Sequence, residues 1–189
     1  DCMDIIMIGN AGASGTVRIA EKKYLELREK YPEWFIDQAK NIQQDQNDEV
    51  YKKVEDIVEK TVAMIKSNDE TIPLTFKCGE GGIMNTLWEL GKVRKKGFVI
   101  DIFSIPIKQE TVEISEFYHL DPYRLESFGA YIAVVRSGAE SMALLKKVGM
   151  EACIIGYLNN SKDKILLFDT DGEVRFLDRP REDELAKVK

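Results

Sequence analysis

Short apolar runs alternate with longer amphipathic stretches along most of this chain. Apolar runs bounded by turn residues predict buried strands, here over residues 4–8, 72–76, 98–103, 131–135, 152–158, 164–168 and 174–177. Apolar residues at helical spacing predict helices, here over 16–30, 32–39, 49–66, 87–90, 110–119 and 137–148. Two shorter helices are expected, one beginning at Asp121-Pro122 and one over 180–186.

The interleaving of these elements indicates the fold class. It predicts an α/β fold of the α+β sandwich kind, with a mixed, mostly antiparallel sheet of about four to six strands flanked by helices. The turn Asp171-Gly172 predicts that the last two strands form a hairpin. Gly149 is a typical residue to end the helix over 137–148. A length of 189 residues fits one ordinary domain.

Composition and charge narrow the class of protein. Hydrophobic residues make up 44% and charged residues 32% of the chain, which is typical of a globular protein. The apolar runs are far shorter than the roughly 20 residues that span a bilayer, so no membrane contact is expected. No signal peptide is visible at the start of the sequence. The sequence also does not begin with Met, which is expected of a piece of a longer protein. With 27 basic and 33 acidic residues, a nucleic-acid partner is not expected either.

The three cysteines, Cys2, Cys78 and Cys153, are far apart in the chain. No CxxC pair is present, and the single histidine, His119, cannot complete a zinc site. We therefore expect no disulfide framework, no metal site and a reducing, cytoplasmic location. Cys153 lies in an apolar run and is predicted to be a core thiol. Three glutamates share one face of the helix over 110–119, and this face is either simply solvated or a weak divalent-cation site: Glu110, Glu113 and Glu116.

Two glycine-rich loops, each leading from a predicted strand into a predicted helix, are candidate anion sites. The first has the pattern Gly9-x-x-Gly12-x-x-Gly15 and includes Asn10. Glycines let backbone N–H groups approach a ligand closely, and the start of a helix adds unpaired donors and a positive dipole end. The spacing differs from GxGxxG and lacks a P-loop lysine, so a plain tight turn is the alternative to phosphate binding.

The second loop is Gly79-Glu80-Gly81-Gly82, preceded by Lys77. Its amides would face a phosphate or carboxylate of a substrate, with Lys77 as counter-charge; the alternative is that Glu80 only caps the following helix. Cys78 is expected to be partly exposed there, with its pKa lowered by the helix dipole. A nucleophilic role would need a base, and no histidine is near in the sequence, so no catalytic residue is assigned.

Three blocks of sequence together resemble a known family. They are 79–90, which includes Gly79-Glu80-Gly81-Gly82, then 105–113, and then 120–129 with Leu125-Glu126-Ser127-Phe128-Gly129. Their order and spacing resemble the C-terminal domain of the aminoimidazole ribonucleotide (AIR) synthetase-related superfamily. Within it, the similarity is to the hydrogenase-maturation, carbamoyl-dehydratase-like branch and its clostridial AIR synthase-related relatives. The first glycine loop matches the start of that domain, and 154–156 and 171–177 match its last strands.

The resemblance implies a single AIR synthetase-related C-terminal domain over 1–189, with a helical insertion at about 32–70. Members join this domain to an N-terminal one that supplies the metal-binding acidic residues and most of the ATP site, and they use ATP to phosphorylate a carbonyl oxygen. We therefore expect no cofactor in this chain itself, and ATP and Mg²⁺ only with the missing N-terminal domain. The expected partners are that domain and a small phosphorylated or carboxylated substrate, in a homo-oligomer, typically a homodimer. The chain alone is predicted not to be catalytic.

The chain also departs from the family pattern. Relatives carry a His-Asp pair and a Thr where this chain has Phe76-Lys77-Cys78-Gly79. The hydrogenase-maturation enzyme ends in a cysteine, which this chain lacks, so synthesis of the nickel–iron hydrogenase cofactor is not expected. The alternative function is a stand-alone, non-catalytic binding or interaction module that kept the fold and lost the chemistry. A further idea is oligomerisation through the helix with Trp34 and Phe35 or through an uncovered sheet face.

Overall fold

The computed structural model describes residues 3–42, 52–53, 56, 75–168 and 172–189. Within them the chain forms a seven-stranded sheet with the strand order β2-β4-β1-β5-β3-β6-β7. Its strands are β1 (Asp4–Ile8), β2 (Thr75–Lys77), β3 (Gly97–Asp101), β4 (Tyr131–Val135), β5 (Ala152–Asn159), β6 (Lys164–Leu167) and β7 (Val174–Phe176). Neighbouring strands are antiparallel except β3 and β6, which are parallel.

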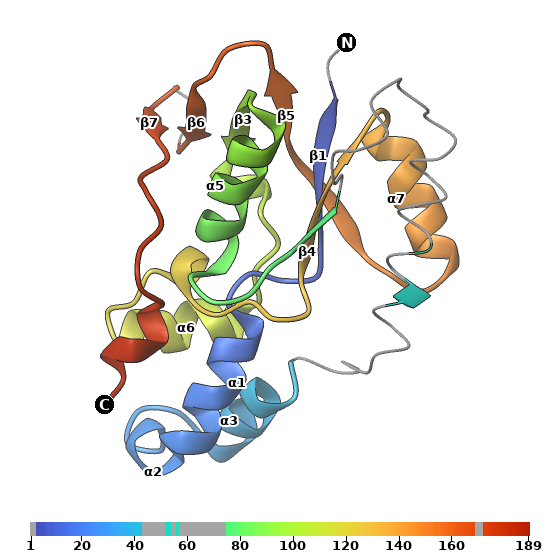
Figure 1. Cartoon of the computed structure of the whole chain (residues 1–189). Coiled ribbons are helices and arrows are strands. Elements are labelled where there is room, and N and C mark those ends of the chain that lie inside the picture. Colours follow the sequence, from blue (N-terminus) through green and yellow to red (C-terminus); the bar gives the residue numbers. More distant parts are fainter. Residues whose placement is uncertain (1–2, 43–51, 54–55, 57–74, 169–171) are drawn as a thin grey trace.

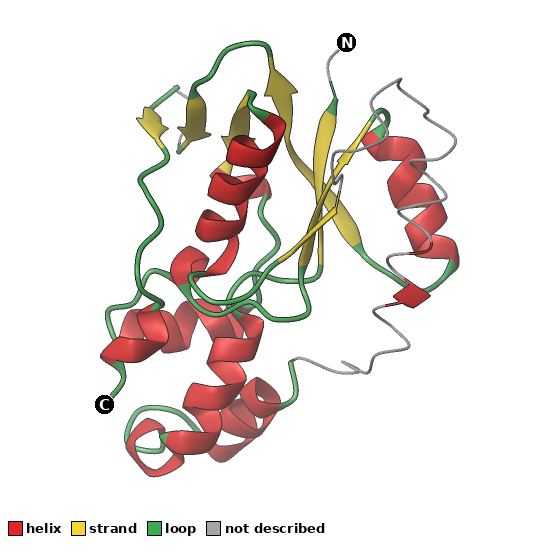
Figure 2. Cartoon of the chain, viewed as in Figure 1, coloured by secondary structure: helices red, strands yellow, loops and turns green. Residues whose placement is uncertain are grey.

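Helices lie on both faces of this sheet and at one end of it (Figures 1 and 2). The α-helices are α1 (Ala13–Lys22), α2 (Tyr24–Leu27), α3 (Glu33–Lys40), α5 (Gly82–Arg94), α6 (Gln109–Phe117) and α7 (Gly138–Lys147). Three short 3-10 helices complete the described part: η1 (Ile102–Ser104), η2 (Pro122–Arg124) and η3 (Glu184–Lys187). None of the described helices has the length and apolar character that crossing a membrane requires.

The central strand β1 is buried on both faces because successive side chains of a strand point in opposite directions. Ile5 and Met7 belong to the core under α5, whereas Ile6 and Ile8 belong to the core under α7. All four of these residues are at most 4% exposed. A third core joins α1, α3 and α6 at the end of the sheet (Figure 1). This arrangement places the start of α1 and the start of α5 at the same end of the sheet.

The predicted fold class is confirmed, and so are β1, β4 and the hairpin of β6 and β7. The sheet has seven strands rather than four to six, because the three-residue strands β2 and β7 join it as its two edges. The helix predicted over 16–30 is divided at Lys23 into α1 and α2. The strand predicted over 98–103 ends at Asp101, whose carboxylate accepts the Phe103 N–H and begins η1.

Other predictions fall partly or wholly outside the described residues. The helix predicted over 49–66 lies outside the described residues except at 52, 53 and 56. The start of the strand predicted over 72–76 lies outside them as well. The prediction that Cys153 is a core thiol is wrong, because Cys153 and Ile154 are both exposed on β5. An apolar run predicts a strand, but it does not predict which of its residues a neighbouring element covers.

Candidate functional site

The first glycine loop, residues 9–15, turns the chain from β1 into α1. Gly9 and Gly12 have φ angles of 85° and 67°, which L side chains rarely adopt. The loop is also tightly packed: a Cβ at Gly12 would lie 2.9 Å from the Pro122 carbonyl oxygen. Asn10 lies half-buried between these two glycines. Glycine is therefore required here by backbone geometry, independently of any ligand.

Amide groups of this loop are already bonded within the protein. The Gly12 N–H donates to Ser127 Oγ at 2.8 Å, and the Gly15 N–H donates to the Glu126 carbonyl at 3.0 Å. Ser14 Oγ donates to the same Glu126 carbonyl at 2.9 Å. The first loop thus docks on residues 125–130, hereafter the bridging segment, and these two amides are not available to a ligand while it stays docked.

The second glycine loop, residues 79–82, turns the chain from β2 into the 13-residue helix α5. Gly81 and Gly82 have φ angles of 74° and 62°. The Gly82 N–H donates to the Gly79 carbonyl at 3.1 Å, which closes the turn. A Cβ at Gly82 would lie 2.4 Å from the Tyr123 carbonyl oxygen, so this glycine lets η2 approach the start of α5.

The bridging segment holds the two loops together. Its Ser127 N–H donates to the Gly79 carbonyl at 3.1 Å, and its Ser127 Oγ accepts from Gly12 and donates to the Leu125 carbonyl at 2.8 Å. Ser127 is fully buried. One residue therefore joins two loops that are far apart in the sequence, the first through its side chain and the second through its backbone N–H. Sequence reasoning singled out both loops but missed Ser127, although the block Leu125–Gly129 that contains it carried part of the family resemblance.

One amide of the second loop holds an anion from the chain itself. The Gly81 N–H donates to Asp183 Oδ2 at 2.6 Å, at the N-terminus of α5. This contact joins the loop to the C-terminal part of the chain, 102 residues further on. An aspartate carboxylate at a helix N-terminus is electrostatically favourable. The loop thus holds a carboxylate of the chain itself.

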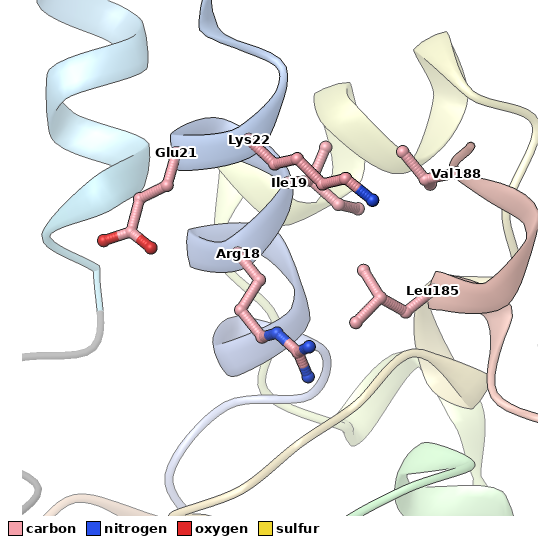
Figure 3. Close-up of a pocket in the computed structure, with 6 residues that line it drawn as sticks. All are labelled: Arg18, Ile19, Glu21, Lys22, Leu185 and Val188. Atoms are coloured by element: carbon pink, nitrogen blue, oxygen red, sulfur yellow. The ribbon is translucent and has the colours of Figure 1, made fainter.

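A hollow of about 570 Å³ lies beside this contact. It is lined by Arg18, Lys22, Glu80, Gly81, Asn85, Glu126, Arg181, Glu182, Asp183, Leu185, Ala186 and Val188. Arg18 is exposed and pairs with the buried Glu126 carboxylate at 2.6 Å. A second hollow of about 360 Å³ follows α1, with Leu185 and Val188 facing Ile19 across it (Figure 3). Both hollows therefore lie between α1 and the C-terminal residues.

Lys77, Cys78 and Glu80 lie around the second loop in different environments. Lys77 and Glu80 are exposed, and Glu80 lines the larger hollow. The prediction for Cys78 is wrong: the residue is only 3% exposed, and burial raises the pKa of its thiol to about 12, although a hydrogen bond with Thr86 lowers it. Its side chain belongs to the core under α5 rather than to the loop surface. Cys78 is therefore a packing residue without nucleophilic character.

No cluster of three metal-binding side chains is present among the described residues. Of the glutamates predicted to share a face of α6, Glu110 is buried at 5% exposure and Glu116 is exposed. Glu113 accepts a hydrogen bond from the Gln109 side-chain amide at 2.8 Å. The face is thus divided between the interior and the solvent, which is not the arrangement of a shared cation site.

Comparison with known proteins gives a consistent result. The family model described as AIR synthase related protein, C-terminal domain, matches residues 5–169. Carbamoyl dehydratase HypE of Rhizobium leguminosarum bv. viciae is 37% identical over 99 residues, which make up 50% of this chain and 28% of that protein.

Two solved structures share the fold at low sequence identity. Hydrogenase maturation protein HypE in complex with ATP gives a TM-score of 0.64 at 14% identity, over 97% of this chain and 52% of that one. AaThiL complexed with AMPPCP and TMP gives a TM-score of 0.53 at 14% identity, over 90% and 48%. The chain thus spans about half the length of these structures and a smaller part of the Rhizobium protein.

Proposed function

The chain belongs to the AIR synthase related C-terminal domain family, and from this premise we propose that it is the substrate-side or phosphate-side domain of an ATP-dependent enzyme. The second glycine loop is its proposed anion site, which takes a phosphate or carboxylate group of a small substrate. The first loop is proposed to line the same side of the site. The ligands in the HypE and ThiL structures, ATP in one and AMPPCP with TMP in the other, are the models for this chemistry.

One observation supports the anion site most directly: the Gly81 N–H holds the Asp183 carboxylate at 2.6 Å. The amide therefore faces a carboxylate and lies where the α5 dipole favours negative charge. Ser127 keeps the first loop within reach of the second through the Gly12 and Gly79 hydrogen bonds. Lys77, next to the loop, is proposed to add the counter-charge.

ATP and Mg²⁺ are proposed to bind only when a further domain is present, since the chain spans about half the length of the HypE structure. The chain alone is then without turnover. Burial of Cys78, with a thiol pKa of about 12, is consistent with this proposal because no thiolate forms there at neutral pH. The same burial favours the second candidate function, a non-catalytic binding module, because an apolar thiol stands where relatives carry polar groups.

A homo-oligomer is also proposed, through the side of the sheet that carries exposed apolar residues. Tyr157 on β5 is 43% exposed, and Val174 and Phe176 on β7 are 50% and 66% exposed. Apolar patches of this kind tend to associate.

A cytoplasmic location is proposed from the free thiols Cys78 and Cys153.

A ligand titration tests the anion site. The full chain is titrated with inorganic phosphate, AMP and Mg²⁺–ATP while backbone amide resonances are recorded. Phosphate is expected to shift the amides of residues 79–82. Lys77→Met should weaken phosphate binding by up to about fivefold, since an exposed charge pair contributes up to about 1 kcal/mol. The control is Lys92→Met, an equal charge change in the last turn of α5. Equal affinities in both variants would remove Lys77 from the site, and no shift at 79–82 would refute the site itself.

A further inference from the structure

The C-terminal residues 181–188, hereafter the strap, cross the second glycine loop. Besides the contact between Asp183 and Gly81, the Asn85 side chain on α5 holds the strap at its beginning: Nδ2 donates to the Arg181 carbonyl at 3.1 Å, and Oδ1 accepts the Arg181 N–H at 3.3 Å. Asp183 Oδ1 accepts the Leu185 N–H at 2.8 Å, which begins η3. The two oxygens of one carboxylate thus cap two helices at once, α5 and η3.

The remaining anchors of the strap lie away from the glycine loop. Val188 is 6% exposed and belongs to the core cluster that contains Ile19, and Leu185 packs against this cluster (Figure 3). Glu184 is buried, and its Oε2 accepts the Asp121 N–H at 3.1 Å. The strap can therefore stay attached through η3 while its first residues leave the loop.

The strap residues beside the loop are more exposed than those of this attachment. Arg181, Glu182 and Asp183 are exposed or half-exposed, and they line the 570 Å³ hollow beside Gly81. Arg181 also pairs with the Asp178 carboxylate just outside the strap. When Asp183 leaves, Arg18 and Lys22 remain on the α1 side of the same hollow. Release of the first strap residues would thus remove one net negative charge from the hollow. The charged side chains that remain there are the cations of Arg18 and Lys22 and the carboxylates of Glu80 and Glu126, the last paired with Arg18.

We propose that the strap is an intramolecular competitor of the ligand at the second glycine loop. The Asp183 carboxylate occupies the place on the Gly81 amide that a substrate phosphate or carboxylate takes, and it leaves when that ligand binds. This inference rests on the proposed function, since it assumes that the loop receives an anion. Ligand affinity is then set in part by the strength of the Asp183 contact, and ligand binding frees residues 181–183.

The test compares two variants of the full chain that lose the same charge. Asp183→Asn weakens the contact with Gly81 but keeps a side chain that caps η3 well. Glu140→Gln removes an exposed carboxylate in the first turn of α7, whose start contacts Asp4 at the other end of β1 from the first glycine loop. Because a hydrogen bond to a charged group commonly changes an equilibrium constant about tenfold, Asp183→Asn should bind inorganic phosphate about tenfold more tightly than the native chain. Glu140→Gln should stay within about twofold of the native chain.

The outcomes separate the two proposals. If the native chain, Asp183→Asn and Glu140→Gln bind phosphate equally, the strap does not compete, and the anion site stands without it. If none binds phosphate, including the variant with the weakened contact, the proposed anion site fails and the competition fails with it. A second readout is hydrogen exchange of the Arg181 amide, which phosphate should accelerate in the native chain by separating it from its Asn85 Oδ1 acceptor. Binding of phosphate without this acceleration would overturn the strap proposal.

Discussion

The packing of η2 against the start of α5 depends on the absence of a side chain at Gly82. An alanine there would hold a φ of 62°, in the left-handed region that costs an L residue about 1–2 kcal/mol. Its Cβ would also lie 2.4 Å from the Tyr123 carbonyl oxygen and 2.7 Å from that of Leu125. Both contacts are with backbone atoms, so one segment has to move, and such overpacking costs about 1–3 kcal/mol.

We expect Gly82→Ala to lower the free energy of unfolding by about 2–4 kcal/mol, after allowing about 0.4–1 kcal/mol for the smaller entropy of the unfolded chain. The matched control is Gly149→Ala after α7, where φ is 80° but a Cβ would meet nothing within 4 Å. It carries the backbone cost alone, about 1 kcal/mol. Equilibrium urea unfolding measures both variants. Equal destabilisation would refute the reasoning, because it would mean that the close approach of η2 contributes nothing.

Two further predictions follow from burial. In a chain with Cys2→Ser, a thiol reagent should modify Cys153 quickly in the folded state and Cys78 only after unfolding. The reason is that Cys78 is 3% exposed and that burial raises the pKa of its thiol to about 12. Rapid modification of both thiols in the folded chain would contradict this prediction. Burial, with a smaller effect of the Glu184 charge, raises the pKa of Asp121 above its ordinary value of 3.8, so the native state holds this proton more tightly than the unfolded chain does. Measured by urea unfolding, the free energy of unfolding of Asp121→Asn minus that of the unmutated chain should therefore increase as the pH rises from below 3.8 through the pKa of Asp121 in the folded state. A difference that stays constant across this range would show that this pKa is not raised.

Local signals were sufficient for much of the fold. The runs 4–8 and 131–135 coincide with β1 and β4, because an apolar run bounded by turn residues specifies a buried strand by itself. Gly149, with its positive φ, follows α7 as predicted. The division of α1 from α2 at Lys23 was not predictable, since no proline or glycine marks it. It lies where α1 packs against α3 and where Tyr24 of α2 meets Lys40 of α3.

The candidate site was predictable only in its loops. Glycine spacing identified residues 9–15 and 79–82, but the contacts that join them are made by Ser127 and Asp183 from distant parts of the chain. A serine or an aspartate has no local pattern that predicts its partner across the fold. Cys78 was misjudged for the same reason: its neighbours in the sequence form an exposed loop, whereas its neighbours in space are the core under α5.

The position of β1 in the sheet has a consequence for how the chain folds during its synthesis. β1 is made first, but both strands that pair with it, β4 and β5, come late in the chain. At about 5–20 residues per second, the roughly 150 residues between Ile8 and Asn159 take on the order of ten seconds to be translated. Until β4 and then β5 are made, the apolar segment Asp4–Ile8 lacks its native partner strands. Nascent β1 is thus the segment where holding chaperones and aggregation compete for the unfinished chain.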